Sequence, residues 1–547
     1  MFGPRSRQYS VRVAVTDFSH QAFEQPETGP EETPPPSLRE RLVPSMPSDA
    51  QWGWLGPIFV AVFGAVLRFM HLGRPHDVVF DETYYAKDAF ATIKYGVERQ
   101  FVDGADKLLL AGNSNIFKQC PQVDQCSAYV VHPPLGKWLI GLGELIFGPN
   151  PFGWRFAAAV VGSLSILILA RVARRMTRST LLGCVAGFLL ALDGLHFVLS
   201  RTALLDIFLM FWLLAGFACL VADRDWARSR TATWYENDHS DGWGARLGSR
   251  PWRLAAGLCL GAALATKWTA AFYIPAFLIM SLAWDLGARR TSGAHRPFTA
   301  VLRRDLPLAA AWSSVVPGLV YVVSFTGWFV SDKGWGRNWV SATSAGPIHF
   351  VTDSLASWIS YQKQVLGFHT GLEQTHPYQS WPWSWPLLTR PVAFFYQSPK
   401  TCGAPSCSWA VLGTGTPVIW YGGLIALIAM VSWYVAVRDW RAGAVLLGYV
   451  VGWLPWFYYA LSDNRTMFLF YAIPMVPFMI LAIVLALGLL MGQADTVNPR
   501  RRIVGTVVTG AFVLFALVNF GWLYPVIAAE VIPYDAWWQR MLFRSWV

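Results

Sequence analysis

Long apolar runs, separated by short polar stretches, dominate the chain. Runs of roughly 17 to 23 apolar residues have the length of a helix that crosses the hydrocarbon core of a bilayer. The strand alternation of an outer-membrane barrel is absent, so the sequence predicts an all-α polytopic membrane protein with about eleven transmembrane helices. The predicted spans are 54–71, 155–173, 180–197, 203–221, 252–266, 268–285, 307–327, 418–436, 442–460, 467–489 and 503–525. Only Lys267 separates the fifth span from the sixth, so these two short spans also fit one bent helix.

Two polar stretches, 72–154 and 328–417, are too long to be turns, and we interpret them as large loops with short helices. Within the first loop, the apolar part of 132–148 is too short to cross a bilayer. We expect it to form a helix that lies in the membrane surface, and a Pro-Pro pair at its start suits a first helical turn.

The first 50 residues differ in kind from the rest. Residues 1–50 are polar and Pro-rich, with no apolar core like that of a signal peptide. The sequence therefore predicts a disordered cytoplasmic tail over 1–50, followed by a single transmembrane catalytic domain over 51–547.

Charge gives the spans a direction. The chain is 54% hydrophobic and only 14% charged, with a formal net charge of +11, and its arginines concentrate in alternate loops. With eleven spans, all of these arginine-rich loops lie on one side, which the positive-inside rule makes the cytoplasm. The same rule accounts for the positive charge without nucleic-acid binding. The N-terminus is then cytoplasmic, and the C-terminus and both large loops are extracytoplasmic. The arginine-rich loops are 171–178, 224–250, 289–304, 438–441 and 500–502.

Four cysteines agree with this sidedness. Cys120 and Cys126 lie in the first outer loop, and Cys402 and Cys407 lie in the second. Each pair encloses a small loop on the oxidising side of the membrane, so we predict the disulfides Cys120–Cys126 and Cys402–Cys407. Free thiols or a metal site are the alternative.

The acids Asp81 and Glu82 stand about ten residues beyond the first span, where charged groups usually line a polar cavity or a site. Three short outer turns carry one cation each, Arg201, Lys267 and Arg465, and these also fit interfacial anchors. Other polar groups predicted on the outer face are His132, Lys137, Arg155, Asp206, Asp463 and His376.

Several cations beside one or two carboxylates, at the rim of a bilayer, suit a phosphate that carries a lipid tail. Arg binds phosphate oxygens with forked hydrogen bonds and Lys binds them as a point charge. A neighbouring carboxylate would take the proton of an incoming hydroxyl, while the cations stabilise the charge that develops on the departing phosphate. No glycine loop for a nucleotide is evident, which favours a lipid-linked sugar donor.

The same residues resemble the protein O-mannosyltransferases, and among them the actinobacterial enzymes. The resemblance runs from about residue 54 to the C-terminus. Its motifs are Phe80-Asp81-Glu82-Thr83-Tyr84-Tyr85, His132-Pro133-Pro134-Leu135-Gly136-Lys137, Arg201-Thr202-Ala203-Leu204-Leu205-Asp206, and His376-Pro377-Tyr378-Gln379-Ser380 followed by Trp383-Ser384-Trp385-Pro386.

This resemblance implies a GT-C glycosyltransferase of the bacterial plasma membrane that transfers mannose, with inversion, from polyprenyl phosphate mannose to Ser or Thr of secreted proteins. It implies Asp81 as the general base with Glu82 beside it, and Arg155 near the donor. The acceptor polypeptides would be met at the secretion translocon. Further donor contacts would be Lys137, Arg201, Arg465, His132 and Lys267, and acceptor or sugar contacts Tyr85, His376 and Trp385.

Three points stay open at this stage. A related enzyme that mannosylates a lipoglycan has the same features, and a membrane transporter is a more distant alternative, disfavoured because the polar residues gather at one rim. Asp81 and Glu82 are too few ligands for a hard-cation site, so we expect no obligatory metal, although a divalent cation is not excluded. Eukaryotic members of the family insert a β-trefoil domain in the second large loop, and 328–417 is too short for it.

Overall fold

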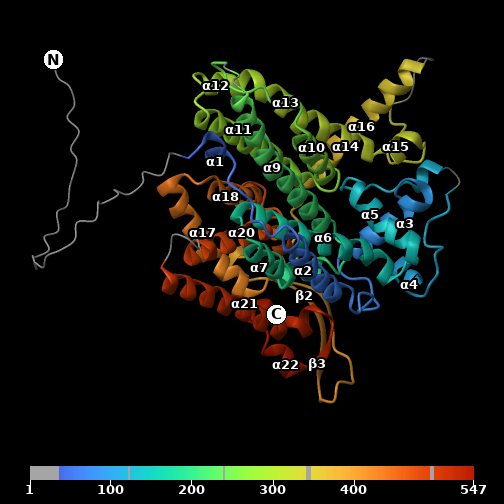
Figure 1. The fold of residues 1–547 in the computed structure, drawn as a ribbon. Helices are drawn as coiled ribbons and strands as arrows, with labels where there is room; N and C mark the ends of the chain where they lie inside the picture. The colour runs from blue at the N-terminus through green and yellow to red at the C-terminus, as the bar shows by residue number, and fades with distance from the viewer. Residues whose placement is uncertain (1–35, 121–122, 238, 240, 341–346, 493–497) are drawn as a thin grey trace, which may run out of the picture. The chain divides into compact units, whose positions relative to one another are not determined.

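The computed structural model describes residues 36–120, 123–237, 239, 241–340, 347–492 and 498–547 (Figure 1). Contacts divide the chain into Met1–Ser37 and Leu38–Val547, and the second unit holds all of the elements below. Most of the tail predicted as disordered lies outside the described residues. Its last part differs from that prediction, because Leu38–Leu42 form helix α1, which packs against α9 and α11 and buries Leu42.

A helix lies at each of the eleven predicted spans. In the described part of the chain, nine helical stretches are long and apolar enough to cross a membrane, while α7 and α10 are shorter, with 12 and 14 residues. The helices of the first six predicted spans are α2 (Trp52–Phe69), α6 (Pro151–Thr177), α7 (Thr180–Ala191), α9 (Leu205–Glu236), α10 (Pro251–Leu264) and α11 (Tyr273–Thr291), which follows the 3-10 turn Trp268–Phe272.

The remaining five spans are also helical, and three of them are made of more than one helical segment. The seventh runs over α12 (Pro297–Ala300), α13 (Leu306–Ala310) and α14 (Val316–Ser324), joined by two π-helical segments. Pro307 and Pro317 remove backbone donors where these segments meet the α-helix. The others are α17 (Pro417–Val437), α18 (Trp440–Trp453) with α19 (Pro455–Ser462), α20 (Val476–Met491) after the 3-10 turn Leu469–Met475, and α21 (Pro499–Ile527).

Helix α6 is central, because it packs against α2, α5, α7 and α9 (Figure 1). Its start is fixed by local chemistry: the Asn150 side chain accepts from the N–H groups of Phe152 and Gly153, and Pro151 occupies the first turn. A Cβ at Gly153 would collide with the carbonyl of Gly148. The tight start of α6 therefore brings Arg155, one turn further on, to a fixed place beside the first outer loop.

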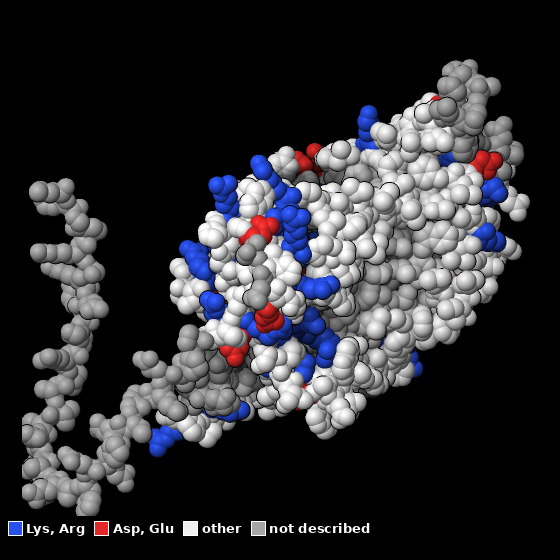
Figure 2. Space-filling model, turned by 45° about the horizontal axis from the view of Figure 1, so that its top comes forward, with Lys and Arg blue, Asp and Glu red and all other residues white. Residues whose placement is uncertain are grey.

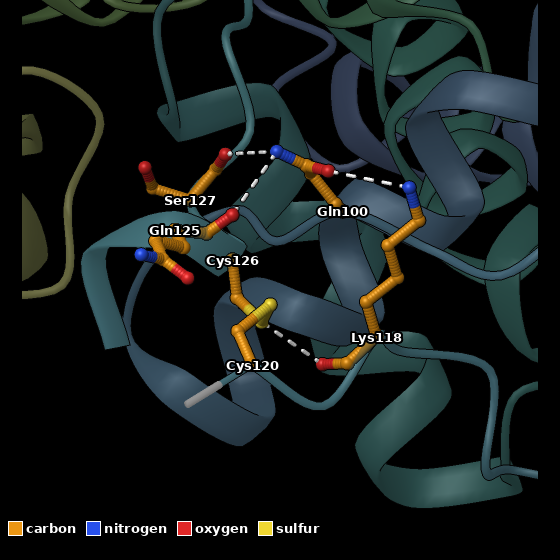
Figure 3. The surroundings of a disulfide bond; sticks show 6 residues. All are labelled: Gln100, Lys118, Cys120, Gln125, Cys126 and Ser127. Carbon is orange, nitrogen blue, oxygen red and sulfur yellow. Dashed lines mark hydrogen bonds between the residues drawn. A yellow bond between two sulfur atoms is a disulfide. The ribbon is translucent and has the colours of Figure 1, made fainter. Parts of the chain in front are cut away.

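The first outer loop contains α3 (Glu82–Tyr95), α4 (Ala105–Leu110) and α5 (Leu135–Phe147). Helix α5 confirms the predicted short helix; it packs on α3 and α6 and leaves Leu145 and Ile146 exposed. The predicted disulfide Cys120–Cys126 is present, with a Cα–Cα distance of 5.7 Å. Beside it, the Gln100 amide donates to the carbonyls of Gln125 and Ser127, so the small loop is fastened at its base (Figure 3).

The second outer loop differs from the prediction of loop and short helices alone. It contains α15 (Thr326–Val330), α16 (Pro347–Thr370) and two antiparallel strands, β1 (Val392–Gln397) and β2 (Cys407–Gly413). A third strand, β3 (Val531–Pro533), comes from the C-terminal end and pairs with β2, followed by α22 (Tyr534–Trp538). The second predicted disulfide, Cys402–Cys407, closes the turn between β1 and β2.

At the opposite end of the helices, four buried charges join α9, α10 and α11. Asp223 accepts from Arg250 at 2.6 Å and from Arg253 at 3.2 Å, and Asp285 accepts from the same two arginines at 3.1 and 2.8 Å. All four side chains are nearly inaccessible to solvent. Each carboxylate therefore shares two guanidinium groups, and removal of one member leaves the others buried without a full set of partners.

We predict that Asp223→Asn lowers the free energy of unfolding by about 3 kcal/mol, the usual cost of breaking a buried ion pair. The measurement is thermal unfolding of the purified protein in detergent. Glu236→Gln is the control, because it breaks the Arg39–Glu236 pair, whose side chains are about half exposed, and should change the midpoint little. Equal shifts in the two variants would show that the four-charge cluster adds no stability.

Candidate active site

Glu82 and Arg155 form a buried ion pair that ties the first outer loop to helix α6. Both side chains are 0% exposed. The Nε and Nη2 groups of Arg155 donate to the two carboxylate oxygens of Glu82, each at 2.8 Å. A forked pair of this kind fixes the relative orientation of both side chains as well as attracting them. The pair therefore holds the first turn of α3 against the start of α6.

Glu82 is also saturated by backbone donors. The N–H of Val79 donates to one carboxylate oxygen at 2.9 Å, and the N–H of Ala203 donates to the other at 3.0 Å. Arg155 also donates hydrogen bonds to the carbonyls of Leu72, Pro75 and Asp77. With both oxygens occupied by charge-assisted bonds and no access to solvent, Glu82 is placed to hold three chain segments together rather than to exchange a proton with a substrate.

Asp81 is in a different situation although it is the next residue. It stands at the N-terminal end of α3, makes no capping hydrogen bond to the helix, and remains partly exposed. Burial raises the pKa of Asp81 to about 7; the nearby Lys267 ammonium opposes this rise, and the nearby Asp206 carboxylate adds to it. A carboxylate that titrates close to neutral pH is suited to accept a proton and release it again.

Lys267 and Asp206 form the ion pair that faces Asp81. The Lys267 Nζ lies 2.8 Å from a carboxylate oxygen of Asp206 and 4.6 Å from the centre of the Tyr471 ring. Burial by itself would lower the pKa of Lys267, but Asp206 and other nearby groups raise it above its ordinary value. The side chain is therefore a firmly charged cation with donors left for another anion.

Lys267 also lines a cavity of about 520 Å³ between the Lys267–Phe272 turn, α16 and α19. One part of its wall is apolar, formed by Leu264, Ala271, Phe272 and Leu366. Another part is aromatic, formed by Trp268, Tyr321, Trp358, Trp456, Tyr459 and Tyr471. The polar part holds Lys267, Arg465, His132, His369 and Gln362. A cavity whose wall combines cations with apolar and aromatic side chains matches an amphiphile with a negatively charged head.

The two histidines of the cavity are neutral. Burial lowers the pKa of His132 well below its ordinary value, and nearby Lys267 adds to the effect. Burial likewise lowers the pKa of His369 to about 4. His369 bonds the carbonyl of Val131 at 2.9 Å, and Arg465 donates to the His369 carbonyl. The imidazoles thus offer hydrogen bonds without charge, and the positive charge of the cavity comes from Lys267 and Arg465.

Two cations that the sequence grouped with the site have other partners. Lys137 is 1% exposed and forms an ion pair with Glu98. Arg201 donates to the carbonyls at the end of α2, including those of Arg68 at 2.7 Å and Met70 at 2.6 Å. Neither residue is part of the cavity wall. In this structure both fasten the loops around the site.

The three residues expected to contact the acceptor or sugar are also spread apart. Tyr85 is buried with its ring 6.0 Å from that of His132, which places it beside the cavity. His376 packs its ring on Phe80 and accepts the N–H of Tyr378, outside the cavity wall. Trp385 is 0% exposed and donates from its indole to Ser380 at 3.0 Å, so it packs in the interior and is closed to a sugar.

Sequence reasoning missed the contribution of α16 to the site. His369 and Gln362 line the cavity from this helix, and Trp358 and Tyr361 pack it onto the turn after α14. The spacing of Trp358, Tyr361 and Val365 is that of one helical face, and this signal could have located the helix. Within the described residues, no group of three or more His, Cys, Asp or Glu side chains is arranged to hold a metal ion.

Comparison with known proteins places this architecture in a family. Residues 58–295 match the family model described as dolichyl-phosphate-mannose-protein mannosyltransferase, and residues 354–546 match the C-terminal four-transmembrane region of protein O-mannosyltransferase. The polyprenol-phosphate-mannose–protein mannosyltransferase of Mycolicibacterium smegmatis is 38% identical over 514 residues, which cover 91% of this chain and 94% of that protein. The chain belongs to the protein O-mannosyltransferase family.

Further relatives of this mannosyltransferase chain agree. The proteins of the same name from Mycobacterium tuberculosis and Corynebacterium glutamicum are 37% and 31% identical, and the matches cover 91% and 92% of this chain and 93% and 96% of those proteins. The solved S. cerevisiae protein O-mannosyltransferase Pmt1-Pmt2 complex bound to the sugar donor has a TM-score of 0.67 at 15% identity, over 94% of both chains. This likeness confirms the expected GT-C fold.

We predict that the two adjacent acids respond oppositely to neutralisation. Glu82→Gln leaves Arg155 buried without its counter-ion and should lower the free energy of unfolding by about 3 to 5 kcal/mol. Asp81→Asn removes a charge that is poorly solvated in the folded state and should leave the unfolding midpoint unchanged or slightly higher. Thermal unfolding of both variants in detergent at pH 8, where Asp81 is ionised, tests this contrast. A larger loss of stability in Asp81→Asn would reverse the two roles.

Proposed function

We propose that this chain transfers mannose from polyprenyl phosphate mannose to Ser or Thr hydroxyls of proteins, on the face of the membrane that holds the two disulfides. Membership of the family, and the shared name of relatives aligned over nearly their whole length, support this activity. The observation that carries the mechanism is local: of two adjacent carboxylates, Glu82 is fully occupied by Arg155 while Asp81 remains uncommitted beside Lys267.

The cavity suits a lipid-linked donor. Its apolar wall matches the isoprenoid part of the donor, and the Lys267 and Arg465 cations match the phosphate. The Nε of Arg465 is buried and has no hydrogen-bond partner within the described residues, which leaves it a donor to share with an anion. The aromatic wall offers faces for the sugar ring. The lipid, phosphate and sugar thus correspond to three parts of one chamber.

The transfer step uses Asp81 as the general base. The acceptor hydroxyl oxygen attacks the anomeric carbon of mannose, and its proton passes to the Asp81 carboxylate. The bond between that carbon and the phosphate oxygen breaks, and the polyprenyl phosphate leaves with its charge stabilised by Lys267 and Arg465. Because the nucleophile enters opposite the departing phosphate, the configuration at the anomeric carbon inverts. Because these two cations stabilise the leaving group, we propose that the step has no obligatory metal ion.

Sidedness rests on two groups of features at opposite ends of the helices. The disulfides, Asp81 and the cavity belong to the outer loops, whereas Arg178, Arg224 and Arg441 lie together at the other end, where Arg441 bonds the Met176 carbonyl and Arg224 stacks on Trp440. By the positive-inside rule the arginine end is cytoplasmic. We therefore place the N-terminus in the cytoplasm, the C-terminus outside, and the site at the extracytoplasmic surface of the plasma membrane, where polypeptides emerge from the secretion translocon.

The first test of Asp81 is a transfer assay with radiolabelled polyprenyl phosphate mannose and a Ser/Thr-rich peptide. Asp81→Asn should lower kcat by at least about 100-fold with little change in the donor KM, because it removes the base and keeps the shape. For the unmodified protein, kcat/KM should rise about tenfold per pH unit up to about pH 7 and then level off, since Asp81 must be deprotonated and its pKa is raised to about 7.

Asp103→Asn is the matched control, because Asp103 is an exposed carboxylate of the same outer loop. Its activity and pH profile should equal those of the unmodified protein. Label that appears on lipoglycan and not on peptide would move the assignment to the related lipoglycan enzyme. Undiminished transfer to peptide by Asp81→Asn would exclude Asp81 as the base.

Lys267→Gln should raise the donor KM by roughly tenfold, the effect of one charge-assisted hydrogen bond. It should also move the acid limb of the pH profile to higher pH, because the Lys267 charge lowers the pKa of Asp81. The exposed Lys107 of α4, in the first outer loop, provides the control Lys107→Gln. Steady-state kinetics from pH 5 to 9 measure both effects. If the acid limb keeps its position in Lys267→Gln, the Lys267 charge does not influence the titration of Asp81.

A further inference from the structure

A second cavity lies at the end of the helices opposite Asp81, and the proposed reaction does not use it. Its volume is about 810 Å³, and it lies between the α6–α7 junction, the end of α20 and the starts of α18 and α21. We call it the inner crevice. Figure 2 shows Lys and Arg side chains gathered, with Asp and Glu among them, on the face of the molecule brought forward from the top of Figure 1.

The polar wall of the inner crevice is cationic. Arg178, Arg441, Arg501 and Arg502 line it, and among the described residues that line it none is Asp or Glu. Arg178 is paired with Asp225 at 3.0 Å and Arg441 with Asp439 at 2.9 Å. Arg501 donates to the Leu489 carbonyl, and neither Arg501 nor Arg502 has a carboxylate partner within the described residues. Within that part of the chain, two positive charges of the crevice are left without an anion.

Three helices begin at this crevice, which adds to its positive potential. Helices α7, α18 and α21 start at Thr180, Trp440 and Pro499, and a helix start carries about half a positive charge. The capping side chains of Ser179, Asp439 and Asn498 satisfy some of the N–H groups there. Three consecutive arginines in the first turn of α21 repel its dipole, and an anion in the crevice would relieve that repulsion.

The rest of the wall is apolar and continues to the outer surface of the bundle. Leu182 and Leu485 form its inner part. At its rim Leu181 is 57% exposed and Leu489 is 40% exposed. A free phosphate ion would not contact the apolar wall. A molecule with a charged head and hydrocarbon chains would contact both the arginines and the apolar wall.

We propose that the inner crevice binds an anionic phospholipid of the adjacent leaflet. Its phosphate would lie between Arg501 and Arg502, and its acyl chains would pass over Leu181 and Leu489 into the bilayer. Basic pockets between transmembrane helices on the cytoplasmic side are typical sites for such headgroups. The lipid would join the starts of α18 and α21 to α7, three helices from distant parts of the sequence.

The test is native mass spectrometry of the purified full chain in detergent, titrated with phosphatidylglycerol or phosphatidylcholine. We expect one phosphatidylglycerol to be retained in preference to phosphatidylcholine. The double variant Arg501→Gln/Arg502→Gln should weaken this binding roughly 25-fold, because each arginine near a membrane surface contributes about fivefold. Phosphatidylglycerol should also raise the thermal midpoint of the unmodified chain and not that of the double variant.

Arg290→Gln/Arg296→Gln is the control, since both arginines are exposed on the same side of the molecule and neither lines the crevice; it should bind like the unmodified chain. Equal retention of the two lipids, or equal loss in both double variants, would overturn the proposal. Competition by soluble glycerol phosphate would assign the site to a free anion instead. Binding that appears only after deletion of residues 1–35 would make that segment the occupant and also contradict the proposal.

Discussion

The Glu82–Arg155 ion pair is the interaction on which the site depends. Two full charges out of contact with water are tolerable only when every lone pair and donor has a partner, and here the partners come from the 72–79 loop, the turn at Ala203 and the start of α6. Satisfying the pair therefore fixes three separate segments at once. Asp81 is held in place by its neighbours in the chain, and its carboxylate makes no capping hydrogen bond to α3. Two adjacent carboxylates thus have different surroundings: Glu82 is buried and fully paired, whereas Asp81 stays partly exposed.

Hydropathy located a helix at each of the eleven predicted spans, and nine helical stretches of the described residues are long and apolar enough to cross a membrane. It misjudged some of their lengths: α9 was expected over 203–221 but continues to Glu236, since ion pairs on its polar extension replace lipid contact. The small sheet was missed because β3 lies more than a hundred residues beyond β2, and pairing at such a distance leaves no local signal. The tail was expected to be disordered up to residue 50, yet it contains the short helix α1, which buries Leu42 against α9.

The same limit applies to the site, because the sequence reveals local features and does not reveal contacts between distant residues. A lone cation in a short outer turn is visible in the sequence, but its partner is not. Lys267 lines the cavity, whereas the guanidinium of Arg201 donates its hydrogen bonds to carbonyls at the end of α2. Residue type alone does not distinguish an arginine that binds a ligand from one that ends a helix. The role of α16 in lining the cavity follows from how the second outer loop folds back over the turn at Lys267, and spacing in the sequence does not record it.

The three-stranded sheet has a consequence for biosynthesis. Strands β1 and β2 are made before α17, whereas β3 follows α21 and is made more than a hundred residues later. Until then the edge of β2 is unpaired, and an open edge invites association with other strands. Loss of the segment after α21 would therefore keep the described membrane helices and leave one edge of β2 without its partner strand.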